Sequence, residues 1–533
     1  MNQLKKMKLF NTWSDVIDSH VEKFPERTAL VFKDHSVSYS QLQILINACA
    51  VHLTRLGIGN GDCVALLCTP RTEALITFLA AAKLGAIWVG LNPKYQASEL
   101  NYVINHSRPK VIMSLRSFES RSYIEDINQA VANDNFKDSE CTVVFFENDS
   151  NDQTSLFENL IQTAESKNAF AVATDYKNDQ SENPCMLVYT SGTTGKPKGV
   201  LLRQKELIFR STMQDKVFST DSYPRVINFA PINHIGGMHF RGLTQVLAGG
   251  TIIYQERYKP SEITVLINKH KVNMLMLGAT MLHMLLEEPS FDMKTFTELE
   301  WFIFSGAPIP FPILKKIYEL CPKVGSTYGL TESCGSVSYT HFPDPIEEMA
   351  FTIGKPVPDG EIRVAGTNGE FLNIGEQGEL QVRREFCMAQ YLNNEKASEE
   401  TFTPDGWLKT GDLAICKPNG SFQLVGRIKE MYKSGGYNVY PREIELALEE
   451  HPDVLLSAVI PQDDQKYQQV GHAYLILKGD TTLNEQEIID WCRIRIANYK
   501  IPKKIFFCES LPMLSIGKID KVALKQQSAS CQF

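Results

Sequence analysis

The stretch from Thr190 to Lys198 carries the residue types that bind a polyphosphate. It reads Thr190-Ser-Gly-Thr-Thr-Gly195-Lys-Pro-Lys198. Glycines let the backbone approach an anion closely, so successive N–H groups and hydroxyls can turn toward phosphate oxygens while two lysines add positive charge. The stretch differs from a Walker-type loop, because Thr190 replaces its first glycine and Pro197 follows Lys196. Taken alone, it fits a polyphosphate loop and an ordinary surface turn equally well.

Four segments further along the chain could supply the other parts of a nucleotide site. Ser305-Gly-Ala-Pro308 is a turn after a predicted strand, where ligand sites of α/β proteins tend to lie. The segment 325–332 offers an aromatic face, hydroxyls and the carboxylate of Glu332, an oxygen ligand suited to Mg²⁺. Asp412 could accept hydrogen bonds from two ribose hydroxyls, and Arg427 could donate two hydrogen bonds to ribose or phosphate oxygens.

Two more residues could do chemistry, although each type is more often structural. Lys518 stands in the tight turn Ser515-Ile-Gly-Lys518, which presents a single cation. His234, in Pro231-Ile-Asn-His234-Ile-Gly-Gly237, is of a kind that more often packs in a core or a loop. Any one of these segments alone is more often a plain turn, so only the whole set together can indicate a nucleotide-binding site.

Alternating helices and strands are predicted to position these segments. Apolar residues recur at helical spacing over 13–24, and Ser38 is suited to cap the next helix. A strand over 64–67, a helix over 73–84 and a strand over 87–89 have the spacing of parallel α/β packing. The same alternation continues in strands at 226–230, 251–254, 274–277 and 301–305 and a helix over 280–286.

The pattern changes twice toward the C-terminus. From 353 to 424 short strands are separated by Gly and Pro, which predicts a β-rich subdomain. After Lys429 come helices over 441–450 and 485–496 and strands over 456–460 and 474–477. These predict a separate α+β domain of roughly a hundred residues.

The composition of this 533-residue chain favours a reducing, cytoplasmic location. A net charge of −8 argues against non-specific nucleic-acid binding.

The reducing location is inferred from the cysteines. The twelve cysteines form no Cys-x-x-Cys pair, and several, such as Cys185, stand inside apolar runs, as buried reduced thiols do. We expect no signal peptide and no transmembrane segment, because the most apolar run, 74–91, includes Lys83 and two glycines and fits a buried helix and strand. The oligomeric state is left open.

Five of these segments, in their order along the chain, resemble the signatures of the adenylate-forming (AMP-binding) superfamily. It comprises acyl-CoA synthetases, aryl-CoA ligases, luciferases and peptide-synthetase adenylation domains. The segments are the phosphate stretch within 189–199, Tyr328-Gly-Leu-Thr-Glu332, Trp407-Leu-Lys-Thr-Gly-Asp412, Gly426-Arg-Ile-Lys429 and Ser515-Ile-Gly-Lys518. The resemblance implies an α/β fold with a large N-terminal domain, residues 1–428, of β-sheets packed with helices plus a β-rich subdomain. It also implies a small mobile α+β C-terminal domain, residues 429–533.

The resemblance further implies which residues bind ATP. They would be Thr190, Ser191, Gly192, Thr193, Thr194, Gly195, Lys198, Ser305, Gly306, Ala307, Thr327, Tyr328, Gly329, Thr331, Asp412 and Arg427. The phosphate stretch would cover the phosphates, Ser305 to Ala307 with Tyr328 the adenine, and Asp412 the ribose.

Catalysis and CoA binding are likewise implied by the resemblance. Lys518, His234 and Glu332 would be the catalytic residues, with Glu332 as the Mg²⁺ ligand. Lys518 would reach the substrate carboxylate and the α-phosphate, because two anions that meet need a cation between them. The small domain would then rotate about a hinge at Lys429 and bring the CoA-binding turn to the site. That turn holds Ser434, Gly435 and Gly436.

The segment 433–445 resembles the version found in acyl-CoA ligases, and the region after His234 lacks the acid expected of an amino-acid-activating domain. The acyl pocket would include Gly236, Gly237, Met238 and Leu277. Its Gly, Met, Leu and Phe content favours a fatty or aromatic acid. Arg241 and His283 could contact a second polar group on the substrate.

The expected function is that of an ATP-dependent acid–CoA ligase, which uses ATP, Mg²⁺, CoA and a small-molecule carboxylic acid. Two alternatives stay open: an enzyme that loads a carrier-protein pantetheine, and a non-catalytic ATP-binding scaffold. An enzyme of long-chain acids could also contact a membrane surface transiently without spanning it.

Overall fold

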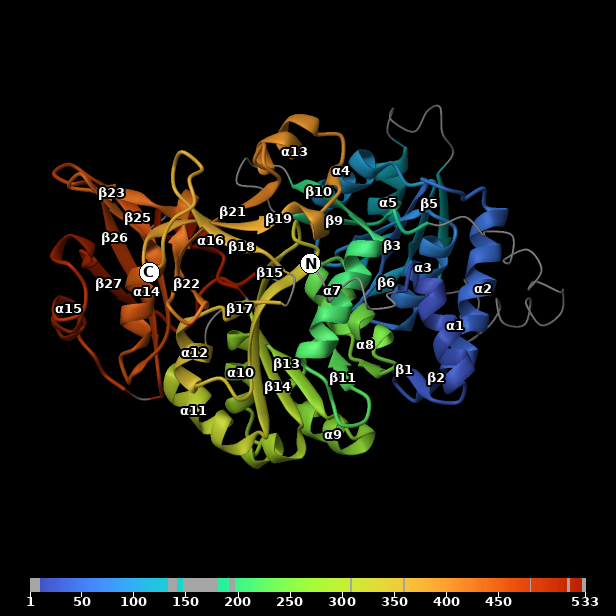
Figure 1. Cartoon of the computed structure of the whole chain (residues 1–533), viewed down its shortest axis with the longest axis horizontal. Coiled ribbons are helices and arrows are strands. Elements are labelled where there is room, and N and C mark those ends of the chain that lie inside the picture. The colour runs from blue at the N-terminus through green and yellow to red at the C-terminus, as the bar shows by residue number, and fades with distance from the viewer. Residues whose placement is uncertain are drawn as a thin grey trace.

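Two large β-sheets, two smaller sheets and a two-stranded ribbon build the protein. The computed structural model describes residues 10–132, 141–146, 180–190, 197–306, 309–357, 360–479, 481–514 and 518–529. In Figure 1 the N-terminal elements lie at the right in blue and the central part of the chain lies in the middle and below in green and yellow. The C-terminal elements form a body of their own at the left, in orange and red.

The first large sheet has seven strands in the order β20-β10-β9-β4-β3-β5-β8. Its strands are β3 (Cys63–Leu67), β4 (Ile87–Leu91), β5 (Val111–Ser114), β8 (Thr142–Phe145), β9 (Pro184–Thr190), β10 (Lys198–Arg203) and β20 (Gln390–Tyr391). All residues of β3 are buried, as expected for a parallel strand that is covered on both faces. The predicted strand–helix–strand unit over 64–89 is confirmed, and β3 and β4 run parallel.

The second large sheet has nine strands in the order β17-β16-β15-β14-β13-β11-β12-β1-β2. Its strands are β1 (Thr28–Phe32), β2 (His35–Ser38), β11 (Arg225–Asn228), β12 (Thr251–Tyr254), β13 (Met274–Leu277), β14 (Trp301–Ser305), β15 (Lys323–Leu330), β16 (Gly335–His341) and β17 (Lys355–Pro356). The six neighbours from β15 to β1 in that order are parallel. Their carboxyl ends therefore meet at one edge of the sheet.

Two smaller sheets follow in the chain. The four-stranded sheet contains β18 (Ile362–Ala365), β19 (Gln377–Arg383), β21 (Trp407–Cys416) and β22 (Phe422–Arg427). The five-stranded sheet contains β23 (Tyr432–Ser434), β24 (Tyr437–Val439), β25 (Val454–Asp464), β26 (Gln468–Leu477) and β27 (Lys504–Phe507). The ribbon pairs β6 (Ser117–Phe118) with β7 (Arg121–Ser122). The β-rich part and the α+β part predicted from the sequence are thus confirmed.

Helices cover the sheets. They are α1 (Trp13–Lys23), α2 (Tyr39–Arg55), α3 (Thr72–Lys83), α4 (Ala97–Ser107), α5 (Ile124–Val131), α7 (Gln204–Val217), α8 (Thr244–Leu247), α9 (Pro260–His270), α10 (Ala279–Leu286), α11 (Phe311–Leu320), α12 (Ile346–Phe351), α13 (Glu395–Thr401), α14 (Pro441–Glu449), α15 (Glu485–Arg493) and α16 (Lys521–Ala529). Ser38 caps α2 as predicted: its hydroxyl accepts from the Gln41 N–H, and the Gln41 side chain accepts from the Ser38 N–H. The apolar run 74–91 is the buried helix α3 followed by β4.

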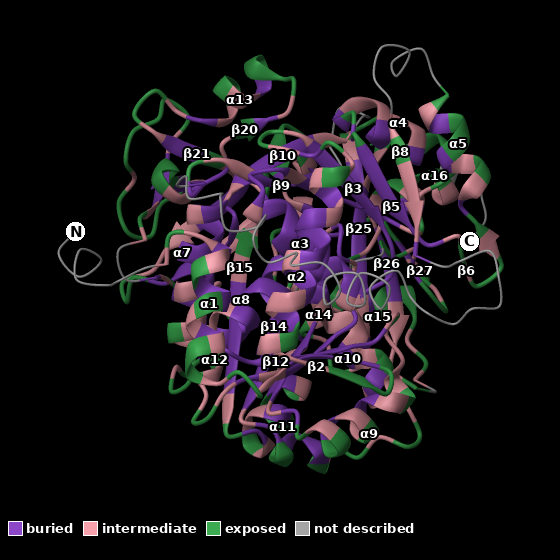
Figure 2. Ribbon diagram, turned by 90° about the vertical axis from the view of Figure 1, so that its right-hand side faces the viewer, coloured by how far each residue is buried: buried purple, intermediate pink, exposed green. Residues whose placement is uncertain are grey.

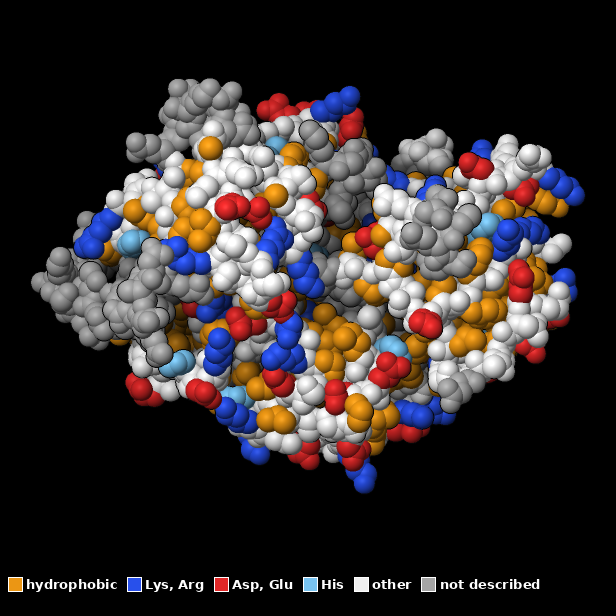
Figure 3. Space-filling model, turned by 180° about the vertical axis from the view of Figure 1, so that it is seen from behind, with side chains coloured by type: hydrophobic (Ala, Val, Ile, Leu, Met, Phe, Trp, Pro, Cys, Tyr) orange, Lys and Arg blue, Asp and Glu red, His pale blue; other side chains and the backbone are white. Residues whose placement is uncertain are grey.

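The interior is buried continuously across both large sheets, as the purple ribbon in Figure 2 shows. On the face seen in Figure 3, basic and acidic side chains are interspersed rather than gathered by sign. Within the described ranges, every helix is too short or too polar to cross a membrane.

Candidate active site

The predicted nucleotide residues of β14 and β15 lie side by side at the carboxyl edge of the nine-stranded sheet. Ser305, the last residue of β14, pairs with Thr327 of β15. The Thr327 hydroxyl is buried and has no hydrogen-bond partner among the described residues. A buried hydroxyl normally has a partner, so this one fits a ligand bound at the strand ends. Ala307, the third residue predicted in this turn, lies outside the described residues.

The phosphate stretch joins two antiparallel strands. Thr190, at the end of β9, pairs with Lys198, at the start of β10. The residues between them that were predicted to bind phosphate, Ser191, Gly192, Thr193, Thr194 and Gly195, lie outside the described residues. The hairpin fixes both ends of this loop at one place on the seven-stranded sheet.

Tyr391, which no sequence pattern singled out, connects Lys198 with Glu332. Its hydroxyl donates to Glu332 Oε1 at 3.0 Å, and the Lys198 ammonium lies 4.7 Å from the centre of its ring. Burial and the charge of Glu332 raise the pKa of Tyr391, so the hydroxyl stays a donor. The structure therefore brings the predicted metal ligand and the phosphate hairpin together.

The segment 388–392, which we call the strap, holds this arrangement through backbone hydrogen bonds. The Met388 N–H donates to the Glu332 carbonyl at 2.8 Å. Ala389 and Leu392 donate to carbonyls of β10, at 2.9 and 2.7 Å. One short segment is thus bound both to the carboxylate residue and to the strand that begins with Lys198.

Glu332 would be the protein ligand of Mg²⁺. In the described part of the chain, no group of three or more His, Cys, Asp or Glu side chains could hold a metal ion by itself. A single carboxylate beside a phosphate loop fits Mg²⁺, which keeps several waters and binds through one or two carboxylates and substrate phosphates.

Gly329 and Thr331 shape the turn between β15 and β16. A Cβ on Gly329 would lie 2.1 Å from the Gly335 carbonyl oxygen, so this position requires glycine. The Thr331 carbonyl accepts from the Cys334 N–H at 3.0 Å. Both residues hold the turn that precedes Glu332.

Asp412, Tyr328 and Arg427 form one hydrogen-bonded group. The antiparallel register of β21 and β22 places Asp412 opposite Arg427. Asp412 is 4% exposed and accepts from the Tyr328 hydroxyl at 2.5 Å and from Arg427 Nε at 2.7 Å. Burial and the Asp412 charge raise the pKa of Tyr328 well above its usual value. Burial alone would lower the pKa of Arg427, but Asp412, Tyr328 and Glu430 together outweigh burial and raise that pKa.

Lys518 reaches this site from the C-terminal part of the chain. A Cβ on Gly306, which has a φ of +87°, would lie 3.5 Å from Lys518 Cε, so the lysine crosses the turn after β14. The Lys518 carbonyl accepts from the Leu514 N–H at 2.7 Å. Burial of the ammonium and the charge of Arg427 lower the pKa of Lys518, although the residue keeps contact with solvent.

His234 faces the same lysine. Its Nδ1 accepts from the Gly236 N–H at 3.1 Å, which leaves the proton of the neutral ring on Nε2. Burial, followed by the charges of Lys518 and Arg241, lowers the pKa of His234 to about 4. The imidazole is therefore neutral near pH 7, and it can donate one hydrogen bond from Nε2.

Of the four predicted acyl-pocket residues, two are glycines close to His234 in sequence and two are side chains of the hydrophobic cores. Gly236 and Gly237 begin a π-helix, η4 (Gly236–Leu243), a form that is frequent at functional sites. A Cβ on Gly237 would lie 2.2 Å from the Pro231 carbonyl oxygen, whereas the nearest atom to one on Gly236 would be His234 Nδ1, at 3.2 Å. Met238 and Leu277 are 2% and 0% exposed and belong to the two large hydrophobic cores. Gly236 thus lies nearest to His234.

The predicted CoA-binding residues lie on the C-terminal sheet. Gly435 and Gly436 form the two-residue turn between β23 and β24, and both have positive φ, as the tightest hairpin turns require. The Gly435 N–H donates to the Tyr467 carbonyl at 2.8 Å, and Ser434 pairs with Gln468 of β26. Lys429 lies in a short 3₁₀ turn between the four-stranded and five-stranded sheets.

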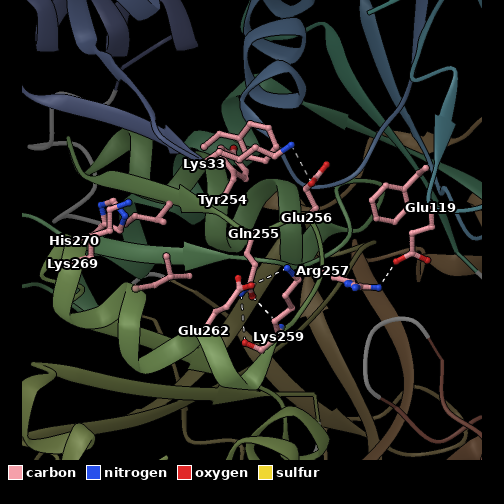
Figure 4. Close-up of a pocket in the computed structure, with 14 residues that line it drawn as sticks. Lys33, Glu119, Tyr254, Gln255, Glu256, Arg257, Lys259, Glu262, Lys269 and His270 are labelled. Atoms are coloured by element: carbon pink, nitrogen blue, oxygen red, sulfur yellow. Dashed lines mark hydrogen bonds and ion pairs between the residues drawn. The ribbon is translucent and has the colours of Figure 1, made fainter. Parts of the chain in front are cut away.

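A charged pocket of about 390 Å³ lies at the ends of β1 and β12, apart from all the predicted site residues. Figure 4 shows three ion pairs among its charged side chains: Lys33 with Glu256, Arg257 with Glu119, and Lys259 with Glu262. A fourth base of its lining, Lys269, pairs with Asp34, so each of these four bases has an acidic partner.

Comparison with known proteins shows the family of this chain. A family model described as AMP-binding enzyme matches residues 17–392, and one described as AMP-binding enzyme C-terminal domain matches residues 443–518. The chain is 30% identical to the putative acyl-CoA synthetase YngI of Bacillus subtilis, over 98% of this chain and 97% of that protein. It is also 30% identical to the long-chain-fatty-acid–CoA ligase FadD13 of Mycobacterium tuberculosis, over 93% of each chain.

A solved structure shows the same fold. It is the o-succinylbenzoate CoA synthetase MenE of Bacillus subtilis in complex with its acyl-adenylate intermediate. The two chains share 28% identity and a TM-score of 0.78, over 96% of this chain and 97% of that one.

Proposed function

Because the chain belongs to the family of AMP-binding enzymes and is an AMP-forming acyl-CoA synthetase, we propose that its substrate is a carboxylic acid with an apolar carbon body. A carboxylate oxygen attacks the α-phosphorus of ATP, and pyrophosphate leaves. The CoA thiol then attacks the acyl carbonyl, and AMP leaves. The acids named for its relatives range from indoleacetate through 2-succinylbenzoate to long-chain fatty acids, so the acid is the finer part of the proposal.

The observation that carries this proposal is the placement of Lys518 across the turn at Gly306, beside His234. The attack brings two anions together, and a fixed cation at their meeting point stabilises the transition state more than the separate reactants. Neutral His234 can donate a hydrogen bond to the same oxygens from Nε2.

We assign the other site residues by the same logic. The loop between Thr190 and Lys198 would bind the phosphates, the strand ends at Ser305 and Thr327 the nucleoside, and Asp412 with Arg427 the ribose. Mg²⁺, held by Glu332 when it is bound, would neutralise charge on the departing pyrophosphate. The chain's own contribution is to orient Glu332 through the Tyr391 hydroxyl.

CoA would enter after the C-terminal domain has turned. We place the boundary at Lys429, so that residues 1–428 form the large domain and residues 429–533 the small, mobile one. The four-stranded sheet ends with Arg427 and the next sheet begins with Tyr432, which supports a hinge between them. Rotation would withdraw Lys518 and bring the Gly435–Gly436 turn, which has no Cβ atoms, against the pantetheine arm.

The apolar body of the acid is supported by the residues around Gly236. Phe229 and Phe240 are buried and lie beside Arg241, whose Nη1 is near Gly236, and Met238 and Leu277 are buried apolar side chains of the same region of the chain. Such a wall favours an aliphatic or aromatic body over a polar one.

The test is acid-dependent ATP–pyrophosphate exchange over fatty, aromatic and amino acids, with and without CoA. Exchange with one apolar class, and acyl-CoA formed only when CoA is added, would support the proposal. Acyl transfer to a holo carrier protein but not to CoA would favour the carrier-loading alternative. ATP binding without exchange for any acid would favour a scaffold.

A cytoplasmic location completes the proposal. All cysteines among the described residues are free thiols, and most are buried. That state fits a reducing compartment. Cell fractionation with an antibody against the chain would test it.

A further inference from the structure

Arg241 is a buried cation whose charge no acid neutralises. It is 6% exposed, and in the described part of the chain it forms no ion pair with Asp or Glu. Its Nη2 donates to the Met276 carbonyl at 2.9 Å and its Nη1 to the Gly236 carbonyl at 3.4 Å, while its Nε has no partner among the described residues. Because arginine has five N–H donors, more than half of its capacity is unused.

Other interior arginines of this chain are better satisfied. Arg363, whose side chain is 9% exposed, pairs with Asp405 at 2.9 Å. Arg210 donates to backbone carbonyls, as Arg241 does, but its Nε also has an acceptor, the Ser333 carbonyl at 3.0 Å. A buried charge with unused donors is costly unless a further partner arrives.

The guanidinium lies on the acid side of the site. A Cβ on Gly236 would be 3.2 Å from His234 Nδ1 and 3.9 Å from Arg241 Nη1, so this glycine separates the two side chains. The rings of Phe229 and Phe240 lie 5.5 and 5.9 Å from the guanidinium carbon. Burial lowers the pKa of Arg241 to about 10, which leaves it charged at neutral pH. His234, Gly236 and a guanidinium flanked by two aromatic rings therefore lie next to one another.

We propose that the acid substrate carries a second anionic group, a carboxylate in the simplest case, which binds Arg241. The inference rests on the proposed function, because it requires that the acid be activated beside His234 and Lys518. The substrate class is then a dicarboxylic acid with an apolar body. One carboxylate is activated at Lys518, while the other stays ionised at Arg241 and sets the orientation.

A carboxylate fits this position better than a ketone or a hydroxyl. Among the described residues the arginine has no acidic partner and its Nε has no acceptor. A carboxylate supplies both a negative charge and acceptors in the planar geometry that a guanidinium matches. A water molecule could accept hydrogen bonds from Arg241 in the unliganded protein, but it would not neutralise the charge of the guanidinium.

The first experiment uses the wild-type enzyme and pairs of acids with equal carbon number: hexanoate and adipate, octanoate and suberate, decanoate and sebacate. We measure kcat/KM for each acid by pyrophosphate exchange. At the best chain length we expect the dicarboxylate to be preferred by about a hundredfold or more, because a site with a buried polar partner rejects analogues that leave it unpaired. Equal values within each pair, or a preference for the monocarboxylates, would overturn the inference.

The second experiment compares Arg241→Met, Arg241→Lys and the control His283→Gln. His283, the other residue that sequence analysis linked to a second polar group, is 30% exposed and lies 3.2 Å from Glu287 on α10. We expect Arg241→Met to lower kcat/KM for the dicarboxylate by about a hundredfold and for the monocarboxylate by less than about fivefold. Arg241→Lys should recover part of the dicarboxylate activity, and His283→Gln should leave the ratio unchanged.

The outcomes separate this inference from the proposed function. An equal loss for both acids in Arg241→Met would mean that the arginine only holds η4 against β13, and the inference would fail while the ligase function stood. If Arg241→Met does not fold, the wild-type acid pairs decide. No exchange with any acid, in wild-type enzyme that binds ATP, would refute the proposed function itself.

Discussion

Replacement of Lys518 by methionine should separate the two half-reactions. Methionine keeps the length of the side chain and removes its charge. The ammonium lies against the turn at Gly306, where the substrate carboxylate would meet the α-phosphate. Two unit charges about 4 Å apart interact by about 4 kcal/mol at an effective dielectric constant near 20. Because the lysine keeps contact with solvent, we take about 2–4 kcal/mol, which corresponds to about 30- to 1,000-fold in rate.

The assay measures each half-reaction by itself. Pyrophosphate exchange reports adenylation and should fall by the factor above. Transfer of the acyl group from chemically prepared acyl-AMP to CoA should change by less than about threefold, because Lys518 would have left the site. Burial lowers the pKa of Lys518, so its charged form is less favourable in the folded than in the unfolded chain at neutral pH. Its removal should therefore not lower the melting temperature.

Lys525→Met is the matched control, since Lys525 is exposed on α16 of the same C-terminal segment. It should leave both half-reactions unchanged. A fall in adenylation of less than about tenfold in Lys518→Met, or an equal fall in both half-reactions, would refute the role assigned to this lysine.

Three further predictions follow from the site. The pKa of Lys518 is lowered by burial and by Arg427, so adenylation should decline as the pH rises through a value below the usual 10.5 of lysine. Glu430→Gln removes a charge that raises this pKa. In a pH profile of pyrophosphate exchange, this variant should therefore show the decline at lower pH. Gly237→Ala should lower the melting temperature by several degrees, because its Cβ would lie 2.2 Å from a backbone oxygen, and an unchanged melting curve would contradict that clash. Tyr391→Phe should raise the Mg²⁺ concentration needed for half-maximal exchange by about tenfold, as loss of an outer hydrogen bond to a metal ligand does, and an unchanged Mg²⁺ titration would argue against this role.

The parts of the site that sequence could predict are those fixed by local chemistry. A glycine turn after an apolar run marks a strand end, so Ser305 could be placed at the end of a strand from sequence alone. That Thr327 lies beside it follows from the pairing of β14 with β15, which the sequence did not show. Asp412 and Arg427 were singled out separately, and the register of two antiparallel strands is what makes them one ion pair. Such a register depends on long-range pairing, which local patterns do not specify.

Tyr391 shows why the rest could not be predicted. It lies 59 residues from Glu332 in sequence and belongs to a two-residue strand, too short to leave a periodic pattern. The strands β25 and β26 were predicted too short for a related reason. Their pairing continues beyond the apolar segments into polar residues, as far as Asp464, which lies opposite Gln468. Arg241 was recognised as a polar residue near the acid, but its lack of an acid partner is a property of the folded neighbourhood.

The strap has a consequence for how this enzyme could change its substrate over evolution or by design. The strap donates backbone hydrogen bonds to Glu332 and to β10, so Glu332 and the phosphate hairpin are held together by segments outside the stretch from β11 to β13. That intervening stretch contains His234, Gly236, Arg241 and Leu277. The stretch proposed to bind the acid can thus be exchanged between relatives while Glu332 and the phosphate hairpin keep their own attachment. A chain arranged in this way can diverge in the acids it accepts without rebuilding the machinery that activates them.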